Sequence, residues 1–421
     1  MKPTTAWTFY DWANSSFSLV ITSAVFPSYF LKNTDDLIHI GSVTMSNSSL
    51  YAYMISAAYL VVAFLSPVLS GFADSANNKK FFLLFFATVG SLSCMGLYFF
   101  KGMDTIVYGG AFFILALIGF LGSIVFYNSF LPEITTEEKF DSLSAKGFSM
   151  GYFGSVLLLI VNLLMINNPG WFGLGGTQEA VLVSFVMVGL WWFIFTVFPL
   201  QSLPGSVRLQ FRQEHLCKGF KILKDVYHKL KNRTEVRQYL WAFFAFNAGV
   251  QTVMMLAATF AEKQMNFSTP ELIILILLIQ IVAIGGSFIF SELSKRKGNK
   301  YSLLTMLYVW VIICAVAYIV QTKVQFYALA TIVGVVMGGI QSLARSTYSK
   351  LIYKYEGEHT SFFSFYDVLE KMSVIIGTFL FGFIEQVSGD MRKSIFMLML
   401  FFIAGIVLLI RTKLNLKATL N

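Results

Sequence analysis

The sequence is poor in charge. Asp, Glu, Lys and Arg make up 13% of its 421 residues, whereas 56% are hydrophobic, and the mean hydropathy is +0.69. Soluble domains carry about 25% charged residues, so this composition excludes a water-soluble globular protein. Most side chains must face lipid or other helices.

Cysteine and histidine are also scarce, with three and four residues. Cys94 and Cys314 lie in apolar runs and Cys217 lies in a polar loop, which argues against a disulfide framework or a metal site. The chain has no Walker-type Lys-Ser/Thr loop, no HExxH and no serine elbow. We therefore expect no cofactor, no bound metal, no ATP-driven transport and no enzymatic activity.

Long apolar runs are abundant. A hydrocarbon core of about 30 Å needs roughly 20 apolar residues in a helix, and runs of that length exclude a β-barrel. The chain has twelve such runs, at about residues 10–31, 50–72, 81–100, 105–130, 148–168, 180–200, 238–261, 271–291, 301–321, 324–347, 362–384 and 394–410. The predicted fold class is an all-α membrane protein with twelve transmembrane helices.

The net charge of +9 is explained by topology rather than by a nucleic-acid partner. If the N-terminus is cytoplasmic, 24 Lys and Arg residues lie in cytoplasmic segments, six lie on the opposite side, and Lys371 lies inside a run, which accounts for all 31. The positive-inside rule then predicts that both termini are cytoplasmic. Compact loops and a short tail favour the inner membrane of a bacterium.

The longest polar segment, residues 201–237, divides the chain into an N-terminal six-helix bundle, 1–200, and a C-terminal one, 238–421. Within this linker, apolar residues recur at helical spacing opposite lysines, which predicts a basic amphipathic helix on the membrane surface. Its apolar positions are Leu216, Phe220, Leu223, Val226, Tyr227 and Leu230.

Two short patterns recur between the halves. Asp74 is followed by Lys79 and Lys80, and Glu292, 218 residues later, is followed by Lys295 and Arg296. Residues 126–129 are echoed by residues 346–349 at an offset of about 220. Because transporters are commonly built from duplicated halves, these offsets indicate two related bundles.

The acid and basic cluster after the second and eighth runs resembles the loop signature of the major facilitator superfamily. Five further segments resemble one branch of it, which contains the autophagy-related vacuolar amino-acid effluxer and its bacterial relatives: residues 10–15, 145–154, 247–252, 338–346 and 362–377. The resemblance covers nearly the whole chain. It implies two pseudo-symmetric six-helix bundles that rock around a central cavity, and export of neutral amino acids.

Charged and strongly polar residues inside the runs are the candidate site. A charge at the bilayer centre costs about 2.5–3.5 kcal/mol on insertion scales, so each one needs a partner or a task. Asp11 and Asn14 share one face of the first helix, where Asp11 either lines a cavity or caps the helix end. Asn247 and Gln251 are i,i+4 on the seventh helix, where they either bind a zwitterion or hold helices together.

The eleventh helix carries Asp367, Glu370 and Lys371. Lys371 lies about ten residues into the helix and therefore near the midplane, and Asp367 lies one turn earlier on the same face. The two form either a static ion pair or a switch in which Lys371 takes a substrate carboxylate or responds to a proton. Arg345, in the tenth helix, either pairs with Asp367 or Asp11 or anchors the helix end.

The residues of the repeated loop signature are predicted to form a cytoplasmic gate, with plain topology determinants as the alternative: Asp74, Lys79, Lys80, Glu292, Lys295 and Arg296. The predicted function is secondary active transport of a small zwitterionic solute, as amino-acid efflux or exchange, by a monomer in lipid with the proton as a candidate coupling ion. The alternatives are a transporter of another small solute, such as a sugar, peptide, nucleoside or drug, and a receptor that does not transport.

Overall fold

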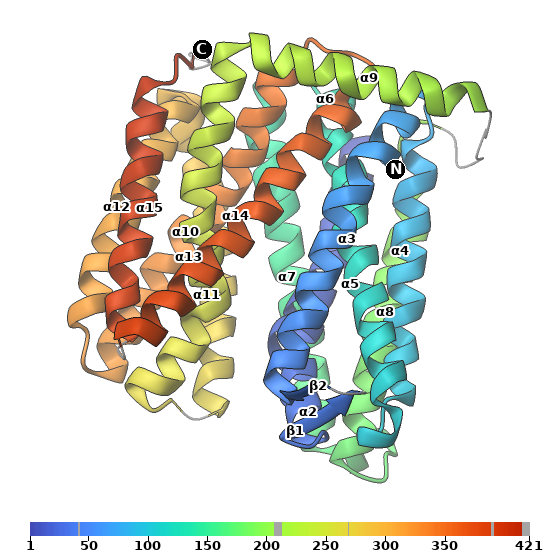
Figure 1. The fold of residues 1–421 in the computed structure, drawn as a ribbon, viewed down its shortest axis with the longest axis vertical. Helices are drawn as coiled ribbons and strands as arrows, with labels where there is room; N and C mark the ends of the chain where they lie inside the picture. Colours follow the sequence, from blue (N-terminus) through green and yellow to red (C-terminus); the bar gives the residue numbers. More distant parts are fainter. Residues whose placement is uncertain (41–42, 206–212, 268, 389–390, 415–421) are drawn as a thin grey trace. The chain divides into compact units, whose positions relative to one another are not determined.

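The computed structural model describes residues 1–421 except 41–42, 206–212, 268, 389–390 and 415–421 (Figure 1). Its α-helices follow one another along the chain as α1 Pro3–Ser16, α2 Phe26–Lys32, α3 Asn47–Ala76, α4 Lys79–Gly96, α5 Ile106–Ser129, α6 Leu131–Ile134, α7 Phe140–Asn167, α8 Thr177–Leu200, α9 Gln213–Asn232, α10 Thr234–Met265, α11 Thr269–Lys297, α12 Asn299–Ile319, α13 Lys323–Ile352, α14 His359–Ser388 and α15 Met391–Arg411. Strands β1 Leu37–Ile40 and β2 Val43–Ser46 form an antiparallel hairpin that pairs Leu37 with Ser46.

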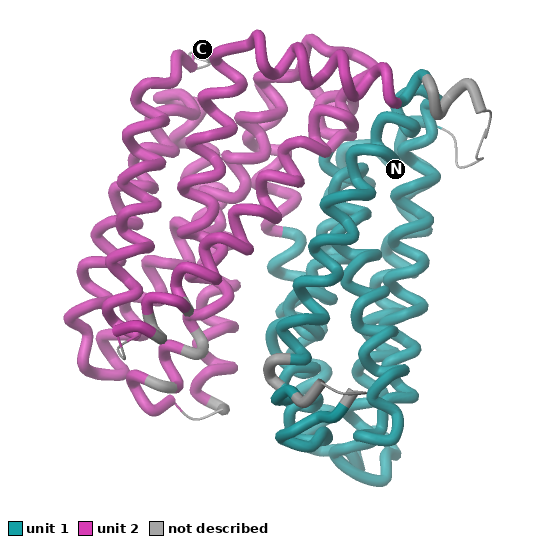
Figure 2. The backbone as a smooth tube through the Cα atoms, viewed as in Figure 1, with its two compact units in different colours: residues 1–128, 150–219 teal, residues 129–149, 220–421 magenta. Residues whose placement is uncertain are grey.

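The chain folds into two compact units, which Figure 2 colours separately. Unit 1 comprises residues 1–128 and 150–219, and unit 2 comprises residues 129–149 and 220–421. Helix α7 therefore contributes its first residues to unit 2 and the rest to unit 1.

Ten helical segments in the described part of the chain are long and apolar enough to cross a membrane; they correspond to α3, α4, α5, α7, α8, α10, α11, α12, α13 and α15. The two other predicted spans are also helical. The first runs from α1 through a π-helix, η1 Phe17–Val25, into α2. The second is α14, which carries the three charged residues Asp367, Glu370 and Lys371. The predicted all-α fold is confirmed, and each of the twelve predicted spans is helical in the described part of the chain.

The turns that follow α3 and α11 use the same device. Asn77, between α3 and α4, has φ +52°, and Gly298, between α11 and α12, has φ +83°. A residue in the left-handed region just after a helix ends it, and Gly and Asn are the residues that tolerate this conformation best. Asn77 thus turns the chain between α3 and α4, and Gly298 turns it between α11 and α12.

Helix α9 forms within the predicted linker, and its apolar positions are divided between two environments. Val226 and Leu230 are buried, and the Lys229 ammonium pairs with the Glu358 carboxylate just before α14. Phe220 and Tyr227 are 59% and 55% exposed. The buried edge of α9 therefore packs on unit 2, and a second edge presents aromatic rings among lysines.

Helices α10 and α14 approach closely in unit 2 because Gly377 has no side chain. A Cβ built at this position would lie 2.3 Å from Thr252 Oγ1 and 2.6 Å from the Ala248 carbonyl oxygen. Ala248 is itself fully buried at this contact, so a larger residue there would also separate the helices.

We expect Gly377→Val to destabilise the protein by about 1–3 kcal/mol, because overpacking forces the two helices apart. Thermal unfolding in detergent measures the effect. The control is Gly285→Ala on α11, where an added Cβ meets no atom within 4 Å. Equal destabilisation by both variants would show that the α10–α14 contact does not limit stability.

Candidate functional site

The centre of the candidate site in unit 2 is a buried ion pair on α14. The Lys371 ammonium contacts the Asp367 carboxylate one turn away, and the residues are 2% and 4% exposed. Each charge inside an apolar bundle would be costly alone, so the pair neutralises itself locally. The two predicted site residues of α14 are therefore brought together.

Two amide side chains of α10 face the same part of α14. Asn247 Nδ2 donates to Ser373 Oγ at 2.7 Å, and Gln251 Nε2 lies 3.5 Å from Glu370 Oε1. Asn247 is buried, whereas Gln251 and Glu370 are partly exposed. The pair of amides predicted at i,i+4 thus lies against the charged turn of α14.

Arg345 lies on α13 and is 4% exposed. Its Nε donates to Ser144 Oγ at 2.9 Å, its Nη2 donates to the Ser144 carbonyl at 3.0 Å, and its guanidinium lies 4.3 Å from the centre of the Phe148 ring. These contacts bind α13 to the first turns of α7 through hydrogen bonds and a cation–π interaction. This partner on α7 was not among those predicted for Arg345.

Asp141, also on α7, is a buried acid that was not among the predicted site residues. Its carboxylate accepts from Lys350 Nζ at 2.7 Å, Ser294 Oγ at 2.7 Å and Asn299 Nδ2 at 2.9 Å. Asn299 in turn donates to Thr347 Oγ1 at 2.9 Å. This network ties residues 129–149 to α11, α12 and α13, and its polar groups satisfy one another.

Near the same segment, Glu133 and Ser129 contact the start of α14. His359 Nδ1 lies 3.5 Å from Glu133 Oε1, and Thr360 Oγ1 donates to Ser129 Oγ at 3.3 Å. Together with Asp141 and Ser144, these contacts hold the segment at both of its ends.

The unit 1 part of the candidate site surrounds Asp11. Tyr127 Oη donates to the Asp11 carboxylate, and the Tyr127 ring stacks on Trp7 with a centroid distance of 4.6 Å. Asp11 lies in the third turn of α1, so it does not cap the helix start. Asn14, one turn further, is 3% exposed, and its Oδ1 accepts from Ser15 Oγ at 3.4 Å.

The predicted gate residues lie near helix ends. Lys80 Nζ donates to the Leu203 carbonyl at 3.0 Å, and Lys79 is buried beside it on α4; Asp74 lies in the last turn of α3. Glu292 pairs with Lys295 and Arg296 at 3.4 and 3.0 Å on the exposed surface of α11. Because both of those pairs lie within one helix, they are weaker determinants of packing than the Asp141 network.

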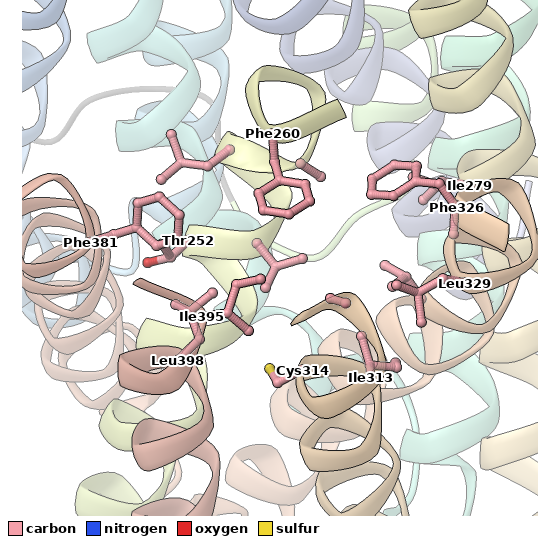
Figure 3. A pocket seen from close by; sticks show the side chains of 16 residues that line it. Thr252, Phe260, Ile279, Ile313, Cys314, Phe326, Leu329, Phe381, Ile395 and Leu398 are labelled. Carbon is pink, nitrogen blue, oxygen red and sulfur yellow. The ribbon is translucent and has the colours of Figure 1, made fainter. Parts of the chain in front are cut away.

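An apolar cavity of about 80 Å³ lies within unit 2 (Figure 3). The side chains that line it come from α10 to α15 and include Phe260, Leu329 and Leu398, with Thr252 and Cys314 as the most polar ones. None of the predicted site residues lines it. A cavity without charged groups cannot satisfy a zwitterion, so the polar cluster of α10 and α14 is the better candidate.

The comparisons identify the family. The profile of the family described as "Vacuole effluxer Atg22 like" matches residues 2–418. An uncharacterized MFS-type transporter of Bacillus subtilis (strain 168), YxiO, is 29% identical over 410 residues, which cover 97% of this chain and 94% of that protein. Autophagy-related protein 22 of Saccharomyces cerevisiae (strain ATCC 204508 / S288c) is 24% identical, with 84% of this chain and 75% of that protein covered.

Solved structures of major facilitator transporters share the fold. FucP in the outward conformation superposes with a TM-score of 0.73 at 13% identity, with 98% of both chains covered. The human organic anion transporter MFSD10 gives a TM-score of 0.68 at 12% identity, with 97% of this chain and 98% of that chain covered. This chain therefore belongs to the Atg22-like vacuole effluxer family of the major facilitator superfamily, whose members are multi-pass membrane transporters rather than enzymes.

Proposed function

We propose that this protein is a secondary active transporter that exports or exchanges small zwitterionic solutes, with amino acids as the first candidates. The observation that carries the proposal is the cluster on α10 and α14, where an ion pair, a further carboxylate and two amides lie within an apolar bundle. A zwitterion presents one carboxylate and one ammonium group. The cluster offers hydrogen-bond donors for the carboxylate and hydrogen-bond acceptors for the ammonium group.

The proposed roles follow from the hydrogen-bonding capacity of each side chain. Asp367 neutralises Lys371 while the site is empty, and a substrate carboxylate competes with Asp367 for that ammonium. Gln251 and Asn247 donate to the same carboxylate. Asp11, Asn14 and Arg345 are proposed as further parts of the substrate pathway.

Alternating access requires that contacts at helix ends form and break during the cycle. We assign the gate to the predicted residues Asp74, Lys79, Lys80, Glu292, Lys295 and Arg296 and to the network around Asp141.

The proposed location is a bacterial inner membrane, with both chain termini in the cytoplasm and a monomer as the working unit.

Purified protein in proteoliposomes should show saturable counterflow of at least one neutral amino acid. We expect Gln251→Ala to weaken the apparent affinity about 10–100-fold, because a hydrogen bond to a charged group contributes roughly 1.5–3 kcal/mol. The control is Gln178→Ala, which removes an exposed amide in the first turn of α8.

Two experimental outcomes would contradict this proposal and support another function. Counterflow of sugars, peptides, nucleosides or drugs without any amino-acid flux would retain the transporter and change its substrate. Saturable binding of an amino acid without counterflow by the wild-type protein would indicate a receptor that does not transport.

A further inference from the structure

Glu370 differs from Asp367 and Asp141, two buried acids of unit 2, because no cation contacts its carboxylate in the described part of the chain. Asp367 pairs with Lys371, and Asp141 pairs with Lys350. In the described part of the chain, no Lys, Arg or His nitrogen lies within 4.0 Å of the Glu370 carboxylate. Its hydrogen-bond partner is Gln251, at a donor–acceptor distance of 3.5 Å. A bond of that length is weak.

The groups around Glu370 are otherwise engaged. On α14, Lys371 is held by Asp367, and Ser373 Oγ donates to the Glu370 backbone carbonyl at 2.7 Å rather than to its carboxylate. On α13, Arg345 donates to Ser144. On α10, Asn247 donates to Ser373, so Gln251 is the one side chain of this helix that donates to the carboxylate among the described residues.

Glu370 is also more accessible than the ion pair beside it. It is partly exposed, whereas Asp367 and Lys371 are buried. An ionised carboxylate at membrane depth is costly without a cation, and a group of this kind marks a proton or ligand site by default. A proton and an organic ammonium group both neutralise it, and each uses the same oxygen atoms.

We propose that Glu370 is the residue at which a proton and the ammonium group of the substrate compete. The inference rests on the proposed function and adds the coupling of substrate binding to proton release. When the ammonium group binds, the Glu370 O–H bond breaks and the proton passes to water, while the carboxylate accepts hydrogen bonds from the ammonium. When the substrate leaves, the carboxylate takes a proton from water. One cationic group is thus exchanged for one proton across a cycle.

The first experiment needs no substrate. Infrared titration of the reconstituted full-length protein should show a protonated carboxyl C=O band that grows as the pH falls and that is absent from Glu370→Gln. The matched control is Glu179→Gln, which removes an exposed acid in the first turn of α8 and should leave that band in place. A band unchanged in Glu370→Gln would overturn the proposal.

The second experiment measures protons released on binding. Addition of a transported amino acid to the wild-type protein in weak buffer should release about one proton per bound molecule over the pH range in which the infrared band is present. Glu370→Gln should release none, and Glu179→Gln should match the wild type. Binding without proton release by the wild type would overturn the competition.

The two experiments separate the possible failures. If no amino acid binds to the wild-type protein while the Glu370 band titrates, the proposed substrate class is wrong and the protonation of Glu370 stands. If amino acids bind and are transported while the band is missing, the proposed function stands and the role of Glu370 is wrong.

Discussion

Replacing Lys371 with alanine is expected to destabilise the protein by about 3–5 kcal/mol, because it removes the cation that pairs with the buried Asp367 on its own helix. Both residues are less than 5% exposed, so water can solvate the remaining carboxylate only if the bundle opens. Thermal unfolding in detergent measures the loss of stability. Solute flux in proteoliposomes should fall to background.

The double variant Asp367→Ala/Lys371→Ala separates packing from transport. Removal of both charges leaves neither member of this pair as a lone buried charge, so most of the lost stability should return. Flux should not return, because the proposed contact of Lys371 with the substrate carboxylate is still missing. A Lys371→Ala protein that is as stable and as active as the wild type would show that the ion pair has neither role.

The second large effect is expected at Asp141. Asp141→Ala leaves Lys350, Ser294 and Asn299 without their shared acceptor, which we expect to cost about 3–5 kcal/mol. The loss should be local at first, because this network ties residues 129–149 to the neighbouring helices. Hydrogen exchange of backbone amides in this segment should accelerate about a hundredfold, as a loss of roughly 3 kcal/mol in local stability predicts.

The control for this prediction is Glu138→Ala, which removes an exposed acid from the same segment. Exposed substitutions change stability by about 0.5 kcal/mol or less, so exchange in the segment should stay at the wild-type rate. If both variants accelerate hydrogen exchange in this segment, or if neither does, the Asp141 network is not part of the gate.

The helices could be predicted from hydropathy because a span of apolar residues is a local property. The observed helix boundaries differ from the predicted ones where partners on other helices neutralise a charged residue. The fifth span was predicted to begin near residue 148, but α7 begins at Phe140 and includes Asp141. A hydropathy pattern treats this carboxylate as solvated, and its partners Lys350, Ser294 and Asn299 lie more than 150 residues away. The π-helix in the first span likewise has no simple sequence signal.

Contacts in the candidate site could be predicted from the sequence where both residues lie on the same helix. The Asp367–Lys371 pair lies within one helix, and its i,i+4 spacing alone predicts the contact. The contact of Gln251 with Glu370 joins α10 to α14, so it depends on how the two helices pack, and Gly377 sets that packing. Glu370 lies between the two paired residues in the sequence, and only the three-dimensional contacts distinguish it from them.

A structure of the protein with a transported amino acid bound would test the account most directly. We predict that the ammonium group lies within hydrogen-bonding distance of the Glu370 carboxylate and that the solute carboxylate is held by Gln251 and Lys371, with Asp367 displaced. An amino acid bound away from α10 and α14, with the Asp367–Lys371 pair intact and Glu370 still next to Gln251, would contradict it.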